Sequence, residues 1–504
     1  MRINRCLLLA ALLALVHLAR FDPTQQPIVT DVRYYVYFAE RIVDGAVPHR
    51  DYFDNKTQLA ALAGAAFDAG GRTLGVEPLL AMRVGYLALT ALAALLLFAI
   101  QRRLFDGSCV AGLLGMLAYL GFSLLGFLPA LGPLPKLLMG VLASAAALLA
   151  MRGAWLLAGA CGALAFLDWQ IGALAGIAVL AAALAERDGR GRAVVRTVLG
   201  GAAVLAGSCA WLAWQGALGA AYRQVVVTSL ARGSTALAKK GFAERVEQIG
   251  ESIRVACPGH EWLVAVGIAG MALLPLLLWR HRGRPTQRLA VVLAVFHYGM
   301  VGFSLTDYQA FGDLFALLAS LAFFAGVTLG LAYEAVQKTL AGRVAASRAV
   351  AVASLLAALL LLRVGRPRLD IELPDRIDKG AATLLDQQSV AQRLAEATAG
   401  LRLLVVNCPE QLYLTGRENL LPIAFWNRAS HDYFRSSPAE ISRATLNRLI
   451  AQVRPDAVAC PTAPVRVNLE KSGAFERIEL RAESGAYGIL LLRRRDTRAL
   501  DAAG

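Results

Sequence analysis

Long apolar runs separated by short basic segments are the feature that most limits what this chain can fold into. A helix needs about 20 residues to cross a hydrocarbon core of roughly 30 Å. Runs of comparable length recur along the chain at Cys6–Ala19, Leu79–Ile100, Val110–Leu128, Leu137–Ala150, Thr197–Trp214, Trp262–Leu278, Leu289–Leu305, Leu314–Tyr333 and Ala349–Leu362. A hydrophobic content of 57% agrees with many spans and excludes a soluble multi-domain enzyme. The sequence therefore predicts a polytopic α-helical membrane protein.

One further apolar run, Gly153–Leu184, is too long for a single span and is interrupted at Asp168. Arg152 precedes this run, and the cluster Arg187–Arg196 follows it. Both ends are therefore predicted to lie in the cytoplasm, which requires two passes with Asp168 at the outer turn. With this hairpin the chain has about eleven predicted transmembrane helices.

Charge is concentrated between the spans, with 51 Lys and Arg against 36 Asp and Glu. This pattern is typical of polytopic proteins, whose basic loops stay in the cytoplasm, and it does not indicate nucleic acid binding. The arginine-rich loops all fit the cytoplasmic side. We predict a bacterial inner-membrane protein with a membrane domain at 1–362, a first outer loop at 21–78 and an extracytoplasmic domain at 363–504.

The segment Gln58–Val76 is apolar but short, and Asp68 and Arg72 interrupt it. It is predicted to be an interfacial helix along the outer leaflet. The alternative is a tilted span, which would invert the orientation of everything downstream.

From Arg363 onward the composition is that of a soluble domain. Helix-compatible and strand-compatible segments alternate there, which predicts a small α/β domain with a partly parallel sheet. Cys408 and Cys460 each follow a predicted strand. If those strands are neighbours the two cysteines form a disulfide, and otherwise both stay unpaired.

The first outer loop is the most polar stretch near the membrane. Asp31 precedes apolar residues at helical spacing and Gly45 ends them, so Asp31 is placed to cap a short amphipathic helix. The loop also carries a spaced pattern formed by Asp31, Tyr35, Ala39, Gly45, Pro48, Asp51 and Lys56.

This pattern resembles the first outer loop of polytopic glycosyltransferases of the GT-C class, in the family 39 or dolichyl-phosphate-mannose mannosyltransferase-like group. Met82-Arg83-Val84 and the tail segment Val406–Arg417 add to the resemblance. It implies transfer of a sugar from a polyprenyl-phosphate carrier to a glycan, lipid or protein acceptor at the outer membrane face, among membrane lipids.

The resemblance also implies roles for individual residues. Asp31 would be the catalytic carboxylate, and Lys56 and Arg83 would bind the donor phosphate. Asp51 and Asp54 are the alternative acids of the same loop.

The sequence also departs from the family pattern. Val32 follows Asp31 where many relatives have a second acid, and Thr57 and Gln58 replace two prolines. Asp168 and Asp307 are either alternative polar partners of the site or solvated turn residues.

A membrane transporter and a non-catalytic scaffold of a cell-envelope glycan pathway are the competing functions. The sparse charge within the spans argues against a transporter. No nucleotide-binding fingerprint is present, and the histidines show no metal-ligand spacing. We therefore predict no cofactor and no protein-bound metal, although use of a divalent metal stays open.

Overall fold

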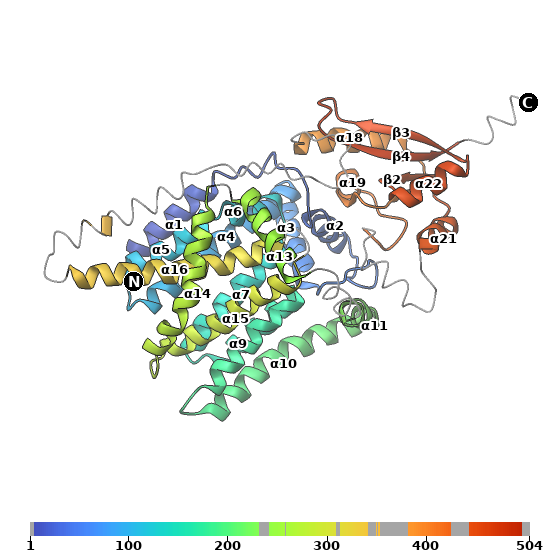
Figure 1. Cartoon of the computed structure of the whole chain (residues 1–504). Coiled ribbons are helices and arrows are strands. Elements are labelled where there is room, and N and C mark those ends of the chain that lie inside the picture. Colours follow the sequence, from blue (N-terminus) through green and yellow to red (C-terminus); the bar gives the residue numbers. More distant parts are fainter. Residues whose placement is uncertain are drawn as a thin grey trace, which may run out of the picture.

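The computed structural model describes residues 5–230, 241–257, 259–308, 313–340, 349, 351–352, 382–424 and 443–495. Its helices form a bundle, and a smaller domain that contains the strands lies beside one end of that bundle (Figure 1). The predicted polytopic α-helical fold with a C-terminal α/β domain is thus confirmed.

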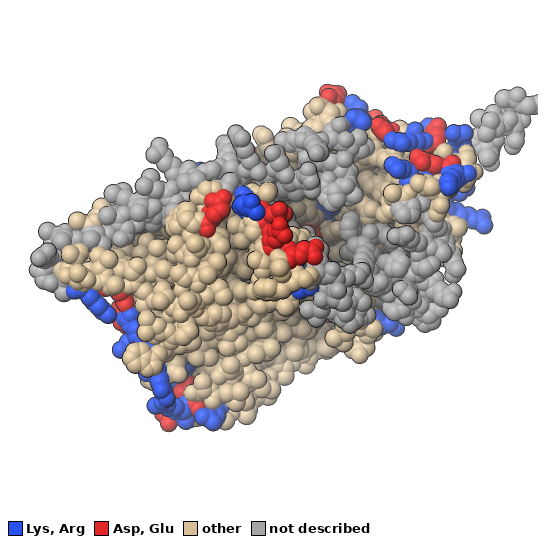
Figure 2. All heavy atoms as spheres, in the orientation of Figure 1, with Lys and Arg blue, Asp and Glu red and all other residues tan. Residues whose placement is uncertain are grey.

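The helices of the bundle follow the predicted apolar runs. They are α1 (Arg5–Leu18), α4 (Pro78–Leu104), α7 (Pro135–Met151), α8 (Trp155–Asp168), α9 (Ala173–Leu184), α10 (Arg190–Trp214), α14 (Glu261–Arg280), α15 (Thr286–Thr306) and α16 (Leu314–Thr339). Within the described residues five helices are long and apolar enough to cross a membrane, and a bent pair makes a sixth. The predicted run 349–362 lies almost wholly outside the described residues, so the number of eleven spans stays a prediction. Figure 2 shows a broad face of the bundle with few charged residues.

The predicted span Val110–Leu128 is not one straight helix, because the chain bends by 59° between α5 (Cys109–Gly121) and α6 (Ser123–Leu131), and a crossing by this bent pair stays a prediction. Phe122 takes an extended conformation at the break and is fully buried. The bend turns α6 toward the first loop, where the Leu131 carbonyl accepts a hydrogen bond from Arg83.

The arginine-rich loops gather at one end of the bundle, which we call the arginine end. Arg280 forms an ion pair with Asp106 at 2.9 Å. Arg288 forms an ion pair with Glu186 at 2.5 Å and lies over the ring of Trp155. Loops that are far apart in sequence therefore share one side, as the charge pattern predicts. A cysteine at an apolar span usually behaves as a small hydrophobic side chain, but Cys6 and Cys109 are joined as a disulfide beside this end.

The predicted hairpin is present, because α8 and α9 are joined by a short 3-10 turn, η1 (Gln170–Gly172). This turn lies at the opposite end of the bundle and binds the first loop there. Gln170 Nε2 donates to the Asn55 carbonyl at 2.6 Å, and Thr57 Oγ1 donates to the Phe166 carbonyl at 2.9 Å.

Two helices form within the first loop. The expected amphipathic helix is α2 (Val32–Val43), and Gly45 follows it with a φ of +98°. The segment predicted to lie along the membrane is α3 (Leu59–Leu74), which packs against α2 and α4. Its orientation relative to the bilayer stays a prediction. Between α10 and α14 the described residues include α11 (Leu218–Ala221), the π-helix η2 (Tyr222–Val227) and α13 (Phe242–Ala256).

The C-terminal domain has the predicted partly parallel sheet. Its elements are α18 (Leu384–Ala397), β1 (Leu403–Val405), α19 (Pro409–Thr415), α21 (Arg443–Val453), β2 (Ala457–Ala459), α22 (Ala463–Lys471), β3 (Phe475–Arg481) and β4 (Gly488–Arg494). The strand order is β1-β2-β4-β3, with β1 and β2 parallel and the other pairs antiparallel. Because β1 and β2 are neighbours, Cys408 and Cys460 meet at their ends in a disulfide. The predicted domain boundary at 363 lies outside the described residues.

Candidate functional site

Asp31 lies immediately before α2 and is exposed. Its side chain makes no capping hydrogen bond to the helix, so the structural role that its position suggests is not realised. Thr30, the preceding residue, has a φ of +56°, a left-handed conformation that non-glycine residues seldom adopt. The carboxylate of Asp31 is therefore placed at a sharp turn of the chain without being used to build the helix.

Asp54 and Lys56 follow in the same loop, close to Asp31. Asp54 is buried, and its Oδ1 accepts a hydrogen bond from the Lys56 backbone N–H at 2.9 Å. Burial raises the pKa of Asp54 to about 7, and the negative charge of Asp31 adds to the rise. The two carboxylates therefore belong to one electrostatic neighbourhood, with a lysine beside them.

Trp169 joins this loop to a second lysine. The Lys56 Nζ lies 5.4 Å from the centre of the Trp169 ring, and the Lys136 Nζ lies 5.0 Å from it. Lys136 also forms an ion pair with Asp313 at 2.8 Å. Two ammonium groups thus face one indole ring at the end of an apolar bundle, an arrangement that suits an anionic group.

Tyr35 and Asp168 belong to the same electrostatic neighbourhood as Asp31 and Asp54. Burial raises the pKa of the Tyr35 hydroxyl well above its usual value, and three carboxylates add to the rise: Asp54, Asp31 and Asp168. Asp168 is fully buried, and its Oδ2 accepts a hydrogen bond from the N–H of Met139, the fifth residue of α7, at 3.0 Å. The alternative that Asp168 is a solvated turn residue is therefore wrong.

The loop that carries Asp54 is held by the π-helix. Gln224 accepts a hydrogen bond from the Asp54 N–H at 3.2 Å and donates one to the His49 carbonyl at 3.0 Å. His49 Nδ1 also lies 2.9 Å from the Gln224 Oε1. Gln224 and His49 are both buried, so these bonds are shielded from water.

Two of the predicted site residues are held by other contacts. The buried guanidinium of Arg83 donates to three backbone carbonyls: Leu131 at 3.0 Å, Pro23 at 2.8 Å and Gln26 at 2.5 Å. These bonds fasten the start of the first loop to the bundle and favour a structural role. Asp51 accepts hydrogen bonds from Arg50 and from the Val47 N–H.

An apolar cavity reaches this site between α4, α5, α7, α15 and α16. Lys136 lies among its lining residues, and most of the others are apolar, among them Leu97, Leu137, Phe296 and Phe315. The cavity therefore combines a cationic group with a hydrophobic interior.

Within the described part of the chain, no three His, Cys, Asp or Glu side chains are grouped so that they could hold a metal ion. The residues brought together instead are two lysines, a tryptophan and several carboxylates.

Lys136, Trp169 and Asp313 are the site residues that the sequence analysis did not identify. Lys136 stands alone in the otherwise apolar stretch that follows Pro133-Leu-Pro135, and this isolated charge was the available signal. Asp313 gives no such signal, because its importance lies only in its contact with Lys136.

The fold of the helical bundle identifies the structural class of the protein. The chain has the GT-C fold of polytopic membrane glycosyltransferases, as its resemblance in the first loop implies. No protein-family model and no curated protein matches the sequence. Among solved structures, it is similar to ArnT from Cupriavidus metallidurans bound to undecaprenyl phosphate, with a TM-score of 0.60, 14% identity and coverage of 97% of this chain and 98% of that one. It is also similar to an Archaeoglobus fulgidus oligosaccharyltransferase tethered with an acceptor peptide, with a TM-score of 0.53, 13% identity and coverage of 90% and 68%.

Replacing Asp54 by Asn should alter how stability depends on pH. Because the folded-state pKa is raised, the wild-type protein should lose stability as the pH rises from about 4 to about 7. Asn does not titrate, so the free energy of unfolding of the variant should rise relative to that of the wild type between about pH 4 and about pH 7, by at most about 4 kcal/mol. Melting temperatures of the two proteins at pH 5 and pH 8 measure this gain. A difference that is the same at both pH values would contradict the raised pKa.

Proposed function

We propose that this chain is an integral-membrane glycosyltransferase that moves a sugar from a polyprenyl-phosphate carrier to a glycan, lipid or protein acceptor. The observation that carries the proposal is the meeting of the Asp31 and Asp54 neighbourhood with Lys56 and Lys136, which face one tryptophan ring. A carboxylate and a pair of cations at the end of an apolar bundle match the needs of this reaction.

The chemistry assigns each group a task. The acceptor oxygen attacks the anomeric carbon of the sugar while the bond from that carbon to the phosphate oxygen breaks, and the phosphate leaves with the electron pair. Asp31 is the exposed carboxylate that would take the proton of the acceptor hydroxyl. Lys56 and Lys136 would stabilise the charge on the departing phosphate.

The surroundings of Lys136 favour a lipid-linked donor. Its side chain is almost fully buried and lines the apolar cavity between the helices. A phosphate bound there would leave its isoprenoid chain next to hydrophobic side chains, where transfer from water is favourable. A water-soluble sugar donor would not use such a lining.

The similar structures are consistent with this assignment. The ArnT structure holds undecaprenyl phosphate, and the oligosaccharyltransferase structure holds an acceptor peptide. In our proposal this chain binds a polyprenyl phosphate, the class of lipid that the ArnT structure holds.

A transporter and a non-catalytic scaffold remain the alternatives. A transporter would need polar groups along a path through the bundle. The charged residues buried within the described spans instead lie close to the first loop: Arg83, Lys136 and Asp168. A scaffold would carry the same fold without transferring sugar, so an assay of sugar transfer distinguishes it from an enzyme.

We also propose that the site and the C-terminal domain face away from the cytoplasm, in a bacterial inner membrane. The basic residues of the arginine end support a cytoplasmic position for that end, and therefore an extracytoplasmic position for the end of the bundle that carries the site. The disulfide between Cys408 and Cys460 agrees with an oxidising compartment for the domain. The Cys6–Cys109 disulfide lies beside the arginine end, and in a reducing cytoplasm we expect these two cysteines to be thiols, so only the disulfide of the C-terminal domain is used to infer the compartment.

Asp31→Asn should abolish most sugar transfer while leaving the protein folded. Loss of general base catalysis typically costs roughly 10²–10⁴-fold in rate, and Asn preserves the shape of the side chain. Transfer from a labelled polyprenyl-phosphate sugar by the purified protein measures the change. Asp51→Asn is the matched control in the same loop and should retain most activity, because Asp51 is held by Arg50 and Val47. Wild-type transfer by the Asp31 variant would refute the assignment.

Lys136→Ala and Lys56→Ala should each weaken donor binding by about 10–100-fold, because a charged hydrogen bond is worth about 1.5–3 kcal/mol. The matching Lys→Arg variants should recover part of the affinity, since they keep the charge with a different geometry. Titration with polyprenyl phosphate measures the affinity directly. Unchanged affinity in both alanine variants would exclude the lysines from the phosphate site.

Cysteine labelling should report the orientation in intact cells. A cysteine replacing Glu483 in the C-terminal domain should react with a membrane-impermeant maleimide, because that side chain is 89% exposed. A cysteine replacing Asp188 at the arginine end should react only after permeabilisation. The reverse pattern would invert the proposed topology.

A further inference from the structure

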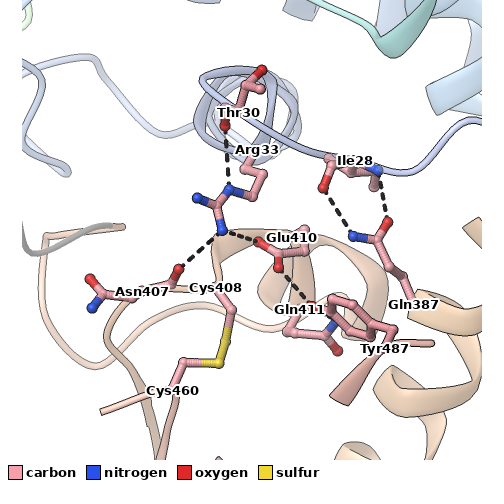
Figure 3. A network of polar contacts seen from close by, with 10 residues as sticks. All are labelled: Ile28, Thr30, Arg33, Gln387, Asn407, Cys408, Glu410, Gln411, Cys460 and Tyr487. Carbon is pink, nitrogen blue, oxygen red and sulfur yellow. Dashed lines mark hydrogen bonds and ion pairs between the residues drawn. A yellow bond between two sulfur atoms is a disulfide. The ribbon is translucent and has the colours of Figure 1, made fainter. Parts of the chain in front are cut away.

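The first loop is held from the outside by the C-terminal domain. The side chain of Gln387 accepts from the Ile28 N–H at 2.7 Å and donates to the Ile28 carbonyl at 3.0 Å (Figure 3). Farther along the loop, the Phe53 N–H donates to the Pro422 carbonyl at 2.7 Å. The segment between these points contains Asp31, so the position of Asp31 depends on contacts made by the C-terminal domain.

Arg33 connects the two domains two residues after Asp31. Its Nε donates to the Thr30 carbonyl at 3.3 Å, within the sharp turn that precedes Asp31. Its Nη1 lies 3.5 Å from the Asn407 carbonyl and 3.9 Å from the Glu410 carboxylate (Figure 3). The side chains of Arg33 and Glu410 are only 11% and 3% exposed, so their charges are poorly screened by water.

Glu410 is itself oriented from the core of the C-terminal domain. The Tyr487 hydroxyl donates to Glu410 Oε1 at 2.8 Å, and Gln411 Nε2 donates to the same hydroxyl at 3.1 Å. Tyr487 directly precedes β4, and Glu410 lies two residues after the disulfide-bonded Cys408. The carboxylate therefore has a fixed place relative to the sheet.

We propose that Glu410, acting through Arg33, is a positioning residue for Asp31. This inference rests on the proposed function, in which Asp31 takes a proton from the acceptor. The left-handed conformation of Thr30 is unfavourable for a side chain that branches at Cβ, so its surroundings must hold it. Arg33 bonds the Thr30 carbonyl, and Glu410 and Asn407 hold Arg33 from the other domain. Loss of the Glu410 charge would release this turn and shift Asp31.

A second ion pair on α2 provides a matched control. Arg41 contacts Glu418 at 2.8 Å, so this pair also joins α2 to the C-terminal domain. The Glu418 side chain is 65% exposed, and a pair exposed to water contributes little to stability. Arg41 also lies far along the helix from Asp31. The control therefore preserves the type of contact but differs in burial, in place and in the N–O distance, which is 2.8 Å against 3.9 Å.

The experiment compares Glu410→Gln with Glu418→Gln in the full-length protein in lipid nanodiscs. Gln keeps the shape of Glu and can still accept from Tyr487, so the change removes mainly the charge. We expect Glu410→Gln to lower kcat by about 10²-fold, the cost of a small misplacement of a catalytic group. Polyprenyl-phosphate affinity should stay within about twofold, because Lys56 and Lys136 are held elsewhere. Glu418→Gln should change neither quantity.

Hydrogen exchange of the backbone over residues 26–36 gives a readout that does not require activity. Exchange should be faster in Glu410→Gln than in the wild type, and unchanged in Glu418→Gln. Tyr487→Phe, which only removes the bond that orients Glu410, should show intermediate exchange and an intermediate kcat.

Three outcomes would overturn the proposal. They are wild-type kcat in Glu410→Gln, wild-type exchange in that variant, and equal losses of kcat and donor affinity accompanied by a lower melting temperature. If the wild type transfers no sugar from any polyprenyl-phosphate donor, the proposed function fails, and the exchange data still decide whether Glu410 holds the turn.

Discussion

Two lysine ammonium groups face one tryptophan ring at the end of an apolar bundle, and the rest of the site is arranged around them. Like charges in a poorly hydrated place need nearby negative charge and fixed dipoles. Asp313 supplies a carboxylate to Lys136, and Asp54 lies beside Lys56. Each acid belongs to the same part of the structure as its lysine, and Trp169, which both lysines face, joins the first loop to the helices of the bundle.

The fold could be predicted to a large extent because burial in a membrane imposes a simple pattern on the sequence. The hairpin over 153–184 followed from its length and its flanking arginines, and α8 and α9 form it, while a membrane crossing by each arm stays a prediction. The helix between Asp31 and Gly45 followed from its apolar spacing. The bend at Phe122 could not be predicted, because both arms are equally apolar and the break depends on how α6 packs under the first loop.

The candidate site was predictable only where its residues are neighbours in sequence. Asp31, Asp54 and Lys56 share one loop. The motif spacing identified Asp31 and Lys56, and Asp54 was named as an alternative acid of the same loop. Lys136 and Asp313 are 177 positions apart in the sequence, and they join these residues only when the chain is folded. Arg83 illustrates the opposite limit, since its charge suggested phosphate binding, whereas the structure uses all three of its guanidinium nitrogens on backbone carbonyls. The number of partners that a buried cation already has cannot be read from its place in a sequence.

The contacts of Gln387 with Ile28 also bear on how the protein is made. The two residues are 359 positions apart, so the ribosome completes the whole helical bundle before the partner of Ile28 exists. Domains generally fold in the order in which they are synthesised. The bundle can therefore enter the membrane first, and the turn before Asp31 receives its outer support only when the last domain folds. A nascent or truncated chain would have the first loop without these contacts. Its site would therefore be complete only after the C-terminal domain has been synthesised and has folded.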